Sequence, residues 1–176
     1  PYLDVERKTH PLDARTGELF GRLQALTAVD IPRYEGGLLF IGRAARRFGD
    51  AFAAGRGVPE GPCTCVPWWA DGEIDSDRLL ILEPGGYLTK GCGIAIGNVH
   101  VEGVTRLLAR YDAKTHPIFS VLLEKGPLGL ARMAEAYGYR IKADYADKCH
   151  LCHEARQVLQ PHFAQWLAPM QHYAWD

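Results

Sequence analysis

The sequence has no excess of charge of either sign and no long apolar run. Its 20 Lys and Arg residues nearly balance 21 Asp and Glu residues, for a formal net charge of -1. Such a chain lacks the basic field that dominates binding to nucleic acid or to anionic lipid, so we expect neither partner. No window approaches the roughly 18 apolar residues of a membrane span, and the first residues do not form a signal peptide. We therefore expect a soluble, cytoplasmic protein without a membrane partner.

The composition is that of a folded protein. Hydrophobic residues make up 47% of the 176 residues and charged residues 23%, which is ordinary for a globular chain and excludes disorder. A chain of this length forms one domain, or a small domain with an appendage, and buries a sizeable core. It begins with Pro1 rather than methionine. We expect a fragment or a processed product of a longer protein.

Cysteine is scarce but clustered. The five cysteines fall into three groups, of which two are close pairs: Cys63 with Cys65, Cys92 alone, and Cys149 with Cys152. An odd number leaves one thiol over in any disulfide scheme, and a reducing compartment favours metal or redox chemistry for clustered thiols. The cysteines are therefore the candidate functional residues.

The first part of the chain predicts an α/β unit. From Asp13 to Val29 apolar residues recur at intervals of three and four, which predicts an amphipathic helix packed on a sheet. Residues 36–42 are apolar between glycines and predict a short strand. Three arginines follow at once, at positions 43, 46 and 47. We expect a solvated basic turn there; the alternative is an anion site at the edge of a sheet.

The middle of the chain predicts an irregular segment and then a hairpin. Residues 49–77 combine glycine, proline and acidic residues with the first two cysteines. An irregular loop of that length usually has a function or is held in place by another group. Residues 78–92 predict a β-hairpin with a Pro-Gly-Gly turn, whose second strand ends at Cys92. Residues 94–99 predict another extended piece.

The remaining sequence predicts helices. Apolar stripes cover residues 102–111 and 118–123, and a third helix is expected to open at Pro127 and to stop at Gly138. A last helix is predicted over residues 151–163, with the C-x-x-C turn at its start. The predicted fold class is α+β: an α/β remnant, a β-hairpin module and a helical C-terminal half.

The clustered thiols suit a metal centre. Thiolate sulfur binds Zn²⁺ and iron–sulfur clusters strongly, and a C-x-x-C turn at a helix start benefits from the N–H groups and dipole of the helix. Any four of the five cysteines could bind one tetrahedral zinc or one [4Fe–4S] cluster, and there are too few for two cubane clusters. The candidate ligands are Cys63, Cys65, Cys92, Cys149 and Cys152.

Other interpretations of the C-terminal pair remain open. Residues 149–153 match C-x-x-C-H, the attachment signature of c-type haem, with Met170 as a distal ligand. A haem would require export and would leave the upstream cysteines unexplained. A thioredoxin-like pair should follow an early strand, and buried cysteines without a ligand explain close pairs poorly. His150 and His153 could replace thiolates on zinc, although such histidines are more often surface or capping residues.

The order of these motifs resembles the C-terminal auxiliary-cluster region of radical SAM proteins, known as the SPASM domain or, in its half-length form, the Twitch domain. The resemblance rests on a loop cysteine, the hairpin Glu83–Cys92, the run Ile96-Gly97-Asn98-Val99 leading into a helix, and the distal C-x-x-C. The upstream helix and strand, with Gly42-Arg43-Ala44, are similar to the end of the partial TIM barrel in such enzymes. The resemblance covers residues 13–163.

This resemblance implies one auxiliary [4Fe–4S] cluster, held by Cys63 or Cys65 together with Cys92, Cys149 and Cys152. In that family such clusters help to bind substrate or relay electrons in enzymes that modify peptides or proteins. Residues 1–48 would then be the end of the barrel, and residues 49–176 the cluster domain.

The sequence departs from the family pattern at three points. Five residues separate Gly86 from Cys92 instead of four, and no C-x5-C-x3-C run follows Cys152, which leaves a one-cluster, Twitch-like form. The C-x-x-x-C-x-x-C motif of the catalytic cluster does not occur, so the chain as given cannot start radical chemistry. We expect an N-terminal radical SAM half as its partner and a peptide or protein as substrate. The alternative is a structural zinc module with no redox role.

Overall fold

The computed structural model describes residues 18, 19, 21, 22, 25, 40–63, 80–90 and 92–173. The chain divides into two compact units, Pro1–Leu38 and Leu39–Asp176. Within the first unit the described residues are helical and exposed, which confirms at these positions the helix predicted from Asp13. In the parts that the structure describes, no helix is long and apolar enough to cross a membrane.

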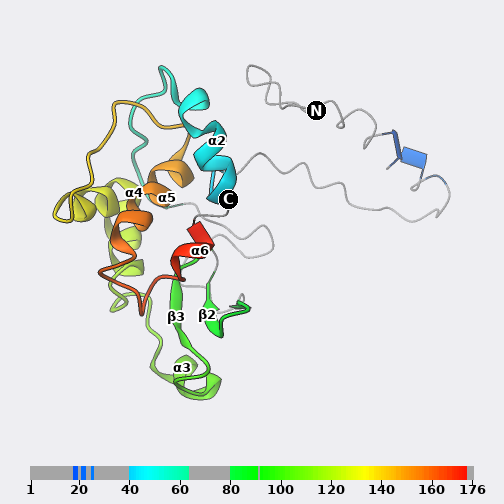
Figure 1. Cartoon of the computed structure of the whole chain (residues 1–176), viewed down its shortest axis with the longest axis vertical. Coiled ribbons are helices and arrows are strands. Elements are labelled where there is room, and N and C mark those ends of the chain that lie inside the picture. The colour runs from blue at the N-terminus through cyan, green and yellow to red at the C-terminus, as the bar shows by residue number, and fades with distance from the viewer. Residues whose placement is uncertain are drawn as a thin grey trace. The chain divides into compact units, whose positions relative to one another are not determined.

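The second unit is a mixed α+β structure, as predicted. Helices α2, α4 and α5 lie together at one end, and the sheet and α3 lie at the other (Figure 1). In chain order the elements are α2 (Gly42–Ala53), β1 (Ile81–Leu82), β2 (Tyr87–Thr89), β3 (Ala95–Asn98), α3 (Val104–Arg110), α4 (Phe119–Glu135), α5 (Lys148–Leu159) and α6 (Met170–Tyr173).

The sheet contains the predicted hairpin. Strands β1, β2 and β3 are antiparallel and neighbours in that order, with Leu88 opposite Gly97. The Pro-Gly-Gly turn closes through the Gly86 N–H, which donates to the Glu83 carbonyl at 2.9 Å. Gly86 has φ +80°, a conformation that glycine adopts without steric cost. The turn residues therefore set the hairpin register.

The C-terminal segment extends this sheet. The Ala95 N–H donates to the Trp166 carbonyl at 2.9 Å, and the Ala168 N–H donates to the Gly93 carbonyl at 2.8 Å. Ile94 and Leu167 form an antiparallel bridge. The residues around Cys92 are thus hydrogen-bonded to the segment that leads into α6.

Residues 42–53 correct the prediction for the basic segment. Gly42 begins helix α2, so the expected basic turn is wrong, and the predicted strand over 36–42 lies mostly outside the described residues. The three arginines are exposed, whereas Ala45, Gly49 and Phe52 are buried at the spacing of one helix face. The arginines obscured this helical period. The predicted boundary between residues 48 and 49 falls inside the helix.

Helix α4 contains the predicted break. Gly126 has φ 63° and ψ −168°, and Pro127 follows it, so two helical pieces meet at a kink. A Cβ at residue 126 would collide with the Gly61 carbonyl oxygen. Glycine is required here by both the backbone conformation and the close approach of the loop that carries Cys63.

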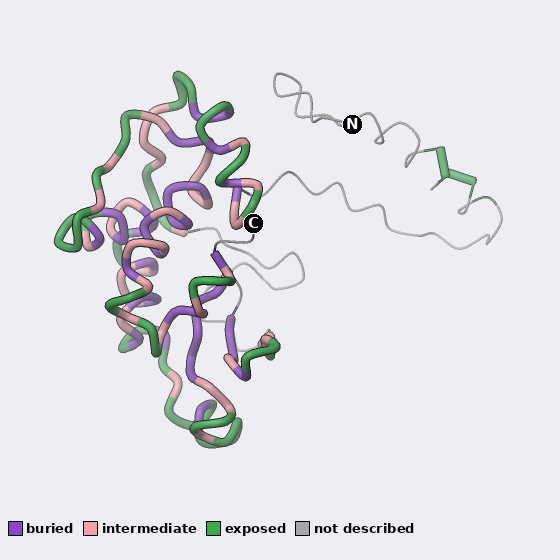
Figure 2. Tube along the Cα trace, in the orientation of Figure 1, coloured by how far each residue is buried: buried purple, intermediate pink, exposed green. Residues whose placement is uncertain are grey.

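The core lies between α4, α5 and the sheet. Figure 2 shows buried residues recurring along these elements. Its fully buried members include Ile96, Leu107, Leu122, Leu130, Leu151, Leu159 and Leu167. Helix α5 packs against α2, α4 and α6. It is therefore the central element of the second unit.

His116 replaces a conventional cap at the start of α4. Its Nδ1 accepts from the backbone N–H groups of Ile118 and Phe119, both at 3.2 Å, and its Nε2 bonds the Ala95 carbonyl at 2.9 Å. These partners assign the proton to Nε2 and join the helix start to β3. Burial lowers the pKa of His116, so the folded protein keeps it neutral.

His116→Ala should lower the free energy of unfolding at pH 7.5 by roughly 1–3 kcal/mol, because a buried carbonyl and two N–H groups lose their partner. The wild-type protein should lose stability as the pH falls below about 6.5. His116 takes up a proton in the unfolded chain but stays neutral in the folded protein. Urea unfolding at pH 7.5 and 5.5 measures the stability that each protein loses between these two pH values, and the variant should lose less than the wild type. The exposed His100, changed to Ala, is the control; equal pH dependence in all three proteins contradicts this role.

Candidate metal centre

Helix α5 presents the C-terminal cysteine pair on one face. The helix begins at Lys148, three residues earlier than predicted, so both cysteines lie in its first two turns. The Asp147 side chain caps it by accepting from the His150 N–H at 2.8 Å. Cys149, Cys152, His153 and Arg156 follow one another at i, i+3, i+4 and i+7, a single helical stripe. The N–H groups of the first turn favour negative sulfur on this stripe.

Cys92 has an unusual backbone conformation. It adopts φ +54°, rare for a residue with a side chain, in the turn after β2. The Tyr173 hydroxyl donates to the Gly93 carbonyl at 2.7 Å. Burial is the main cause that raises the pKa of Tyr173 to about 12, and Arg156 opposes it. The backbone next to Cys92 is therefore hydrogen-bonded to α6.

The segment before Cys63 also reaches the start of α5. The Lys148 ammonium group donates to the Pro62 carbonyl at 3.1 Å. The Gly61 carbonyl of the same segment lies against the kink of α4 at Gly126. Cys63 itself is half-buried against the core. The segment before Cys63 is thus linked to the start of α5, where Cys149 and Cys152 lie, and Cys65 lies outside the described residues.

The described cysteines do not form a preassembled zinc site. No disulfide joins the cysteines at 63, 92, 149 and 152. A tetrahedral zinc with sulfur ligands holds them about 3.8 Å apart. Within the described ranges, however, the thiols form no group of three with all sulfur atoms within 4.8 Å. Thiolates at the corners of a four-iron cluster are separated by the cluster itself.

The group of three that does meet this distance is Asp50, His150 and Glu154. Lys142 already occupies it: its ammonium group donates to Asp50 at 2.9 Å and to Glu154 at 2.6 Å. A metal ion would have to displace this cation. Asp50 is also largely exposed, with 80% of its side chain accessible. These residues form a lysine-centred polar network and do not suit a metal.

Both histidines of the motif are buried, so the prediction of surface histidines is wrong, whereas His153 does accept the N–H of Gly42, the first residue of α2. His150 accepts the Ala146 N–H at Nδ1 and bonds Glu154 through Nε2 at 3.1 Å. Both of its nitrogens are thereby used, which argues against a zinc ligand. The ring also packs closely against α2, because a Cβ at Gly49 would collide with the Nε2 of His150.

His153 differs from His150 in having an unused nitrogen. Its Nδ1 accepts the Gly42 N–H at 3.3 Å, while its buried Nε2 has no hydrogen-bond partner among the described residues. Burial and the neighbouring Arg156 lower its pKa to about 4, so the ring is neutral. An unsatisfied buried polar atom on the cysteine stripe of α5 is consistent with a group that the described residues do not include.

Arg156 and Tyr173 are site residues that the sequence interpretation did not single out. Arg156 is 1% exposed, its Nε donates to the Cys152 carbonyl at 3.2 Å, and its guanidinium lies 5.4 Å from the centre of the Tyr173 ring. The sequence feature that could have identified Arg156 is its position on the same helical stripe as the two cysteines of α5. Nothing in the sequence near Tyr173 connects it with the cysteines.

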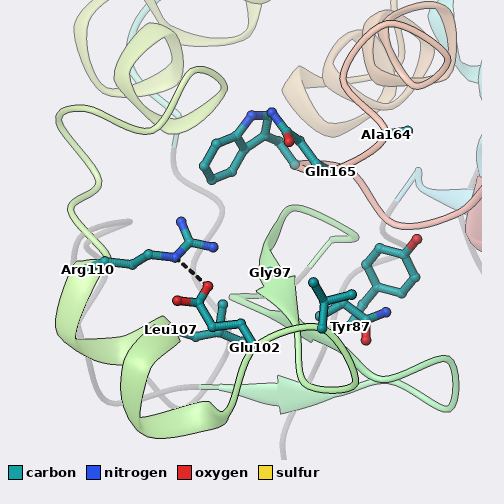
Figure 3. A pocket seen from close by; sticks show the side chains of 10 residues that line it. Tyr87, Gly97, Glu102, Leu107, Arg110, Ala164 and Gln165 are labelled. Carbon is teal, nitrogen blue, oxygen red and sulfur yellow. Dashed lines mark hydrogen bonds and ion pairs between the residues drawn. The ribbon is translucent and has the colours of Figure 1, made fainter.

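A pocket of about 370 Å³ lies beside β3 and α3 (Figure 3). Arg110 donates to Glu102 at 2.8 Å, and its guanidinium lies 5.7 Å from the centre of the Trp166 ring. The pocket is lined by Tyr87, Gly97, Asn98, Val101, Glu102, Leu107, Arg110, Ala164, Gln165 and Trp166. No described cysteine lines this pocket, so it is distinct from the candidate metal centre.

Comparison of the chain with protein-family models, with curated proteins and with solved structures found no match.

Glu154→Gln tests the polar network that holds α5 to α2. Burial by itself raises the pKa of Glu154, but hydrogen bonds from His150, Lys142 and Tyr139 outweigh it and lower the pKa to about 2. The carboxylate therefore stabilises the fold above about pH 4.3, and this stabilisation is lost toward pH 2. We expect the variant to lose roughly 1–3 kcal/mol at pH 7 by urea unfolding.

The loss caused by Glu154→Gln should shrink as the pH falls from 4.3 to 2. Asp50→Asn is the control and should change stability by less than about 0.5 kcal/mol, because Asp50 is exposed. Equal losses in the two variants would contradict a special role for Glu154.

Proposed function

We propose that this chain binds one auxiliary [4Fe–4S] cluster and forms the C-terminal part of a radical SAM enzyme. Cys92, Cys149 and Cys152 would hold the cluster together with Cys63 or Cys65. When bound, such a cluster supplies a one-electron redox centre or an iron site that binds substrate. Helix α5 supplies two thiolates and a favourable dipole, and the turn after β2 supplies the third.

Two contacts support this proposal. The Tyr173 hydroxyl donates to the Gly93 carbonyl, next to Cys92, and the Tyr173 ring lies beside Arg156, whose Nε donates to the Cys152 carbonyl. Cys92 and Cys152 are 60 positions apart in the sequence and lie on elements of different type. Cores do not require two thiols at one point, whereas a metal centre does. The contact between Lys148 and Pro62 brings the loop of Cys63 to the same helix start.

The proposal extends to the rest of the enzyme. The helix in the first unit would be the end of a partial TIM barrel, and a catalytic N-terminal half would supply the three-cysteine motif that this chain lacks. The substrate would be a peptide or protein. Thiolate ligands of this kind persist in the reducing cytoplasm, which is the proposed location.

Metal analysis separates the cluster from its alternatives. After anaerobic purification we expect a brown protein with about four iron and four acid-labile sulfide per chain. One zinc, no iron and no colour would instead establish the structural zinc module. Covalently bound haem, with thioethers at both cysteines of the C-x-x-C motif, would establish a cytochrome fragment. Met170 would then be the distal haem ligand, so only in that case would Met170→Leu change the visible spectrum.

Cys92→Ser separates a ligand from a buried thiol. If Cys92 binds the cluster, the variant should lose metal affinity by roughly tenfold or more and should show faster hydrogen exchange over residues 57–63. Both changes have one cause, because the centre ties the loop to α5. Met170→Leu is the control that removes an exposed sulfur and should change neither quantity. Wild-type metal content in Cys92→Ser, with only a mild loss of stability, would refute its role as a ligand.

A further inference from the structure

The pocket beside β3 and α3 has walls that are held in place. Trp166 is tied to the sheet, because its carbonyl accepts the Ala95 N–H at 2.9 Å and its ring centre lies 4.8 Å from that of His116. Gly97 is buried, and a Cβ there would lie 3.1 Å from the Nη2 of Arg110. The absence of a side chain at position 97 therefore leaves room for the arginine beside the strand.

Arg110 supplies this pocket with a guanidinium that is only partly used. Its Nε donates to Glu102 at 2.8 Å, and its Nη2 donates to the Ile96 carbonyl at 3.3 Å. The position of the guanidinium over the Trp166 ring adds a cation–π contact. Among the described residues Nη1 has no hydrogen-bond partner, and 43% of the side chain is accessible. The guanidinium is thus fixed in orientation and still has N–H groups to donate to a ligand.

The charge beside the pocket is positive. Glu102 is shared by two arginines, because the Nε of Arg106 also lies 4.0 Å from its carboxylate. One carboxylate therefore faces two guanidinium groups, which leaves one positive charge unbalanced. A guanidinium binds a carboxylate through two parallel N–H···O bonds, so a carboxylate is the ligand group that suits Arg110.

The remaining lining of the pocket is largely apolar and aromatic. Tyr87 lies on the opposite side from Arg110 (Figure 3), and Trp166 also lines the pocket. Val101 is 87% exposed, so an apolar side chain is available at the rim. The volume of about 370 Å³ lies near the small end of ligand sites, which span roughly 300–1,000 Å³. Such a space accommodates one ring or branched aliphatic group together with the carboxylate that it carries.

We propose that this pocket binds a carboxylate borne by an aromatic or branched apolar group, with the carboxylate on Arg110 and the apolar group against Tyr87 and Trp166. The proposal does not depend on a metal centre. Glu102 has two opposed effects on the ligand: it orients the guanidinium through Nε, and its negative charge repels the incoming carboxylate. The ligand is either a free acid or the carboxyl end of a peptide, since both present the same group.

The test is a titration of the whole isotope-labelled chain with phenylacetate, followed by nuclear magnetic resonance. We expect a Kd on the order of 1 mM, as for a ligand of about ten heavy atoms, with shifts in the amide signals of Gly97 and Arg110 and in the indole N–H signal of Trp166. Phenylacetamide has the same shape without the charge and should bind roughly tenfold more weakly. Raising the salt concentration should weaken the binding of phenylacetate but not that of phenylacetamide.

Two substitutions in the ion pair should change the affinity in opposite directions. Arg110→Gln should weaken phenylacetate binding roughly tenfold or more, because the charged donor is lost. Glu102→Gln should tighten it by roughly two- to fivefold, because the repelling charge is lost while an amide oxygen remains to accept from Nε. Arg106→Gln is the matched control, since Arg106 lies on the same helix and beside the same carboxylate but does not line the pocket; it should change the Kd by less than about twofold.

N-acetylphenylalanine distinguishes the two sources of the carboxylate, because it carries the ring and the charge in the form of the last residue of a peptide. Tighter binding than that of phenylacetate assigns the site to a peptide end, and weaker binding assigns it to a free acid. Equal binding of phenylacetate and phenylacetamide, or binding of neither, overturns the proposal. A folded Arg110→Gln variant with wild-type affinity also overturns it. If Arg110→Gln does not fold, the sign of the change in Glu102→Gln and the salt dependence still decide.

Discussion

The structure of the second unit depends on the burial of a polar helix. Helix α5 lies at the centre of the fold, yet His150, His153 and Arg156 are each 3% exposed or less. Buried polar groups are stable only with partners, so each of these side chains restricts what may pack beside the helix. The partners come from α2, from the lysine-centred network and from α6. The partners that these buried polar side chains require therefore determine where the neighbouring elements lie.

The same constraint places the candidate ligands. His150 brings α2 and the loop before α5 together, and Arg156 brings Tyr173 beside the turn that carries Cys92. The cysteine stripe of α5 is consequently enclosed by groups that already have fixed positions.

Two polar clusters surround α5, and they differ in kind. On one side Lys142 neutralises two carboxylates, so the cluster around Glu154 is complete without a ligand. On the other side the unused Nε2 of His153 and the positive charge of Arg156 lie beside thiols. The second arrangement leaves a buried polar atom without a partner among the described residues. The chemistry of the site follows from the sign of the buried charge as much as from the cysteines.

The sequence by itself determined the local elements of this protein and the residues that could bind metal. The hairpin followed from its Pro-Gly-Gly turn, the break in α4 from Gly126 and Pro127, and the start of α5 to within three residues, because these features depend on neighbouring residues. It did not predict α2, where arginines hid the helical period, or the roles of His116, Arg156 and Tyr173. Those roles are contacts between residues far apart in the chain, and only the tertiary structure decides which such residues meet. Spacing indicated the residue type that binds metal, and packing around α5 decided where Cys149 and Cys152 lie.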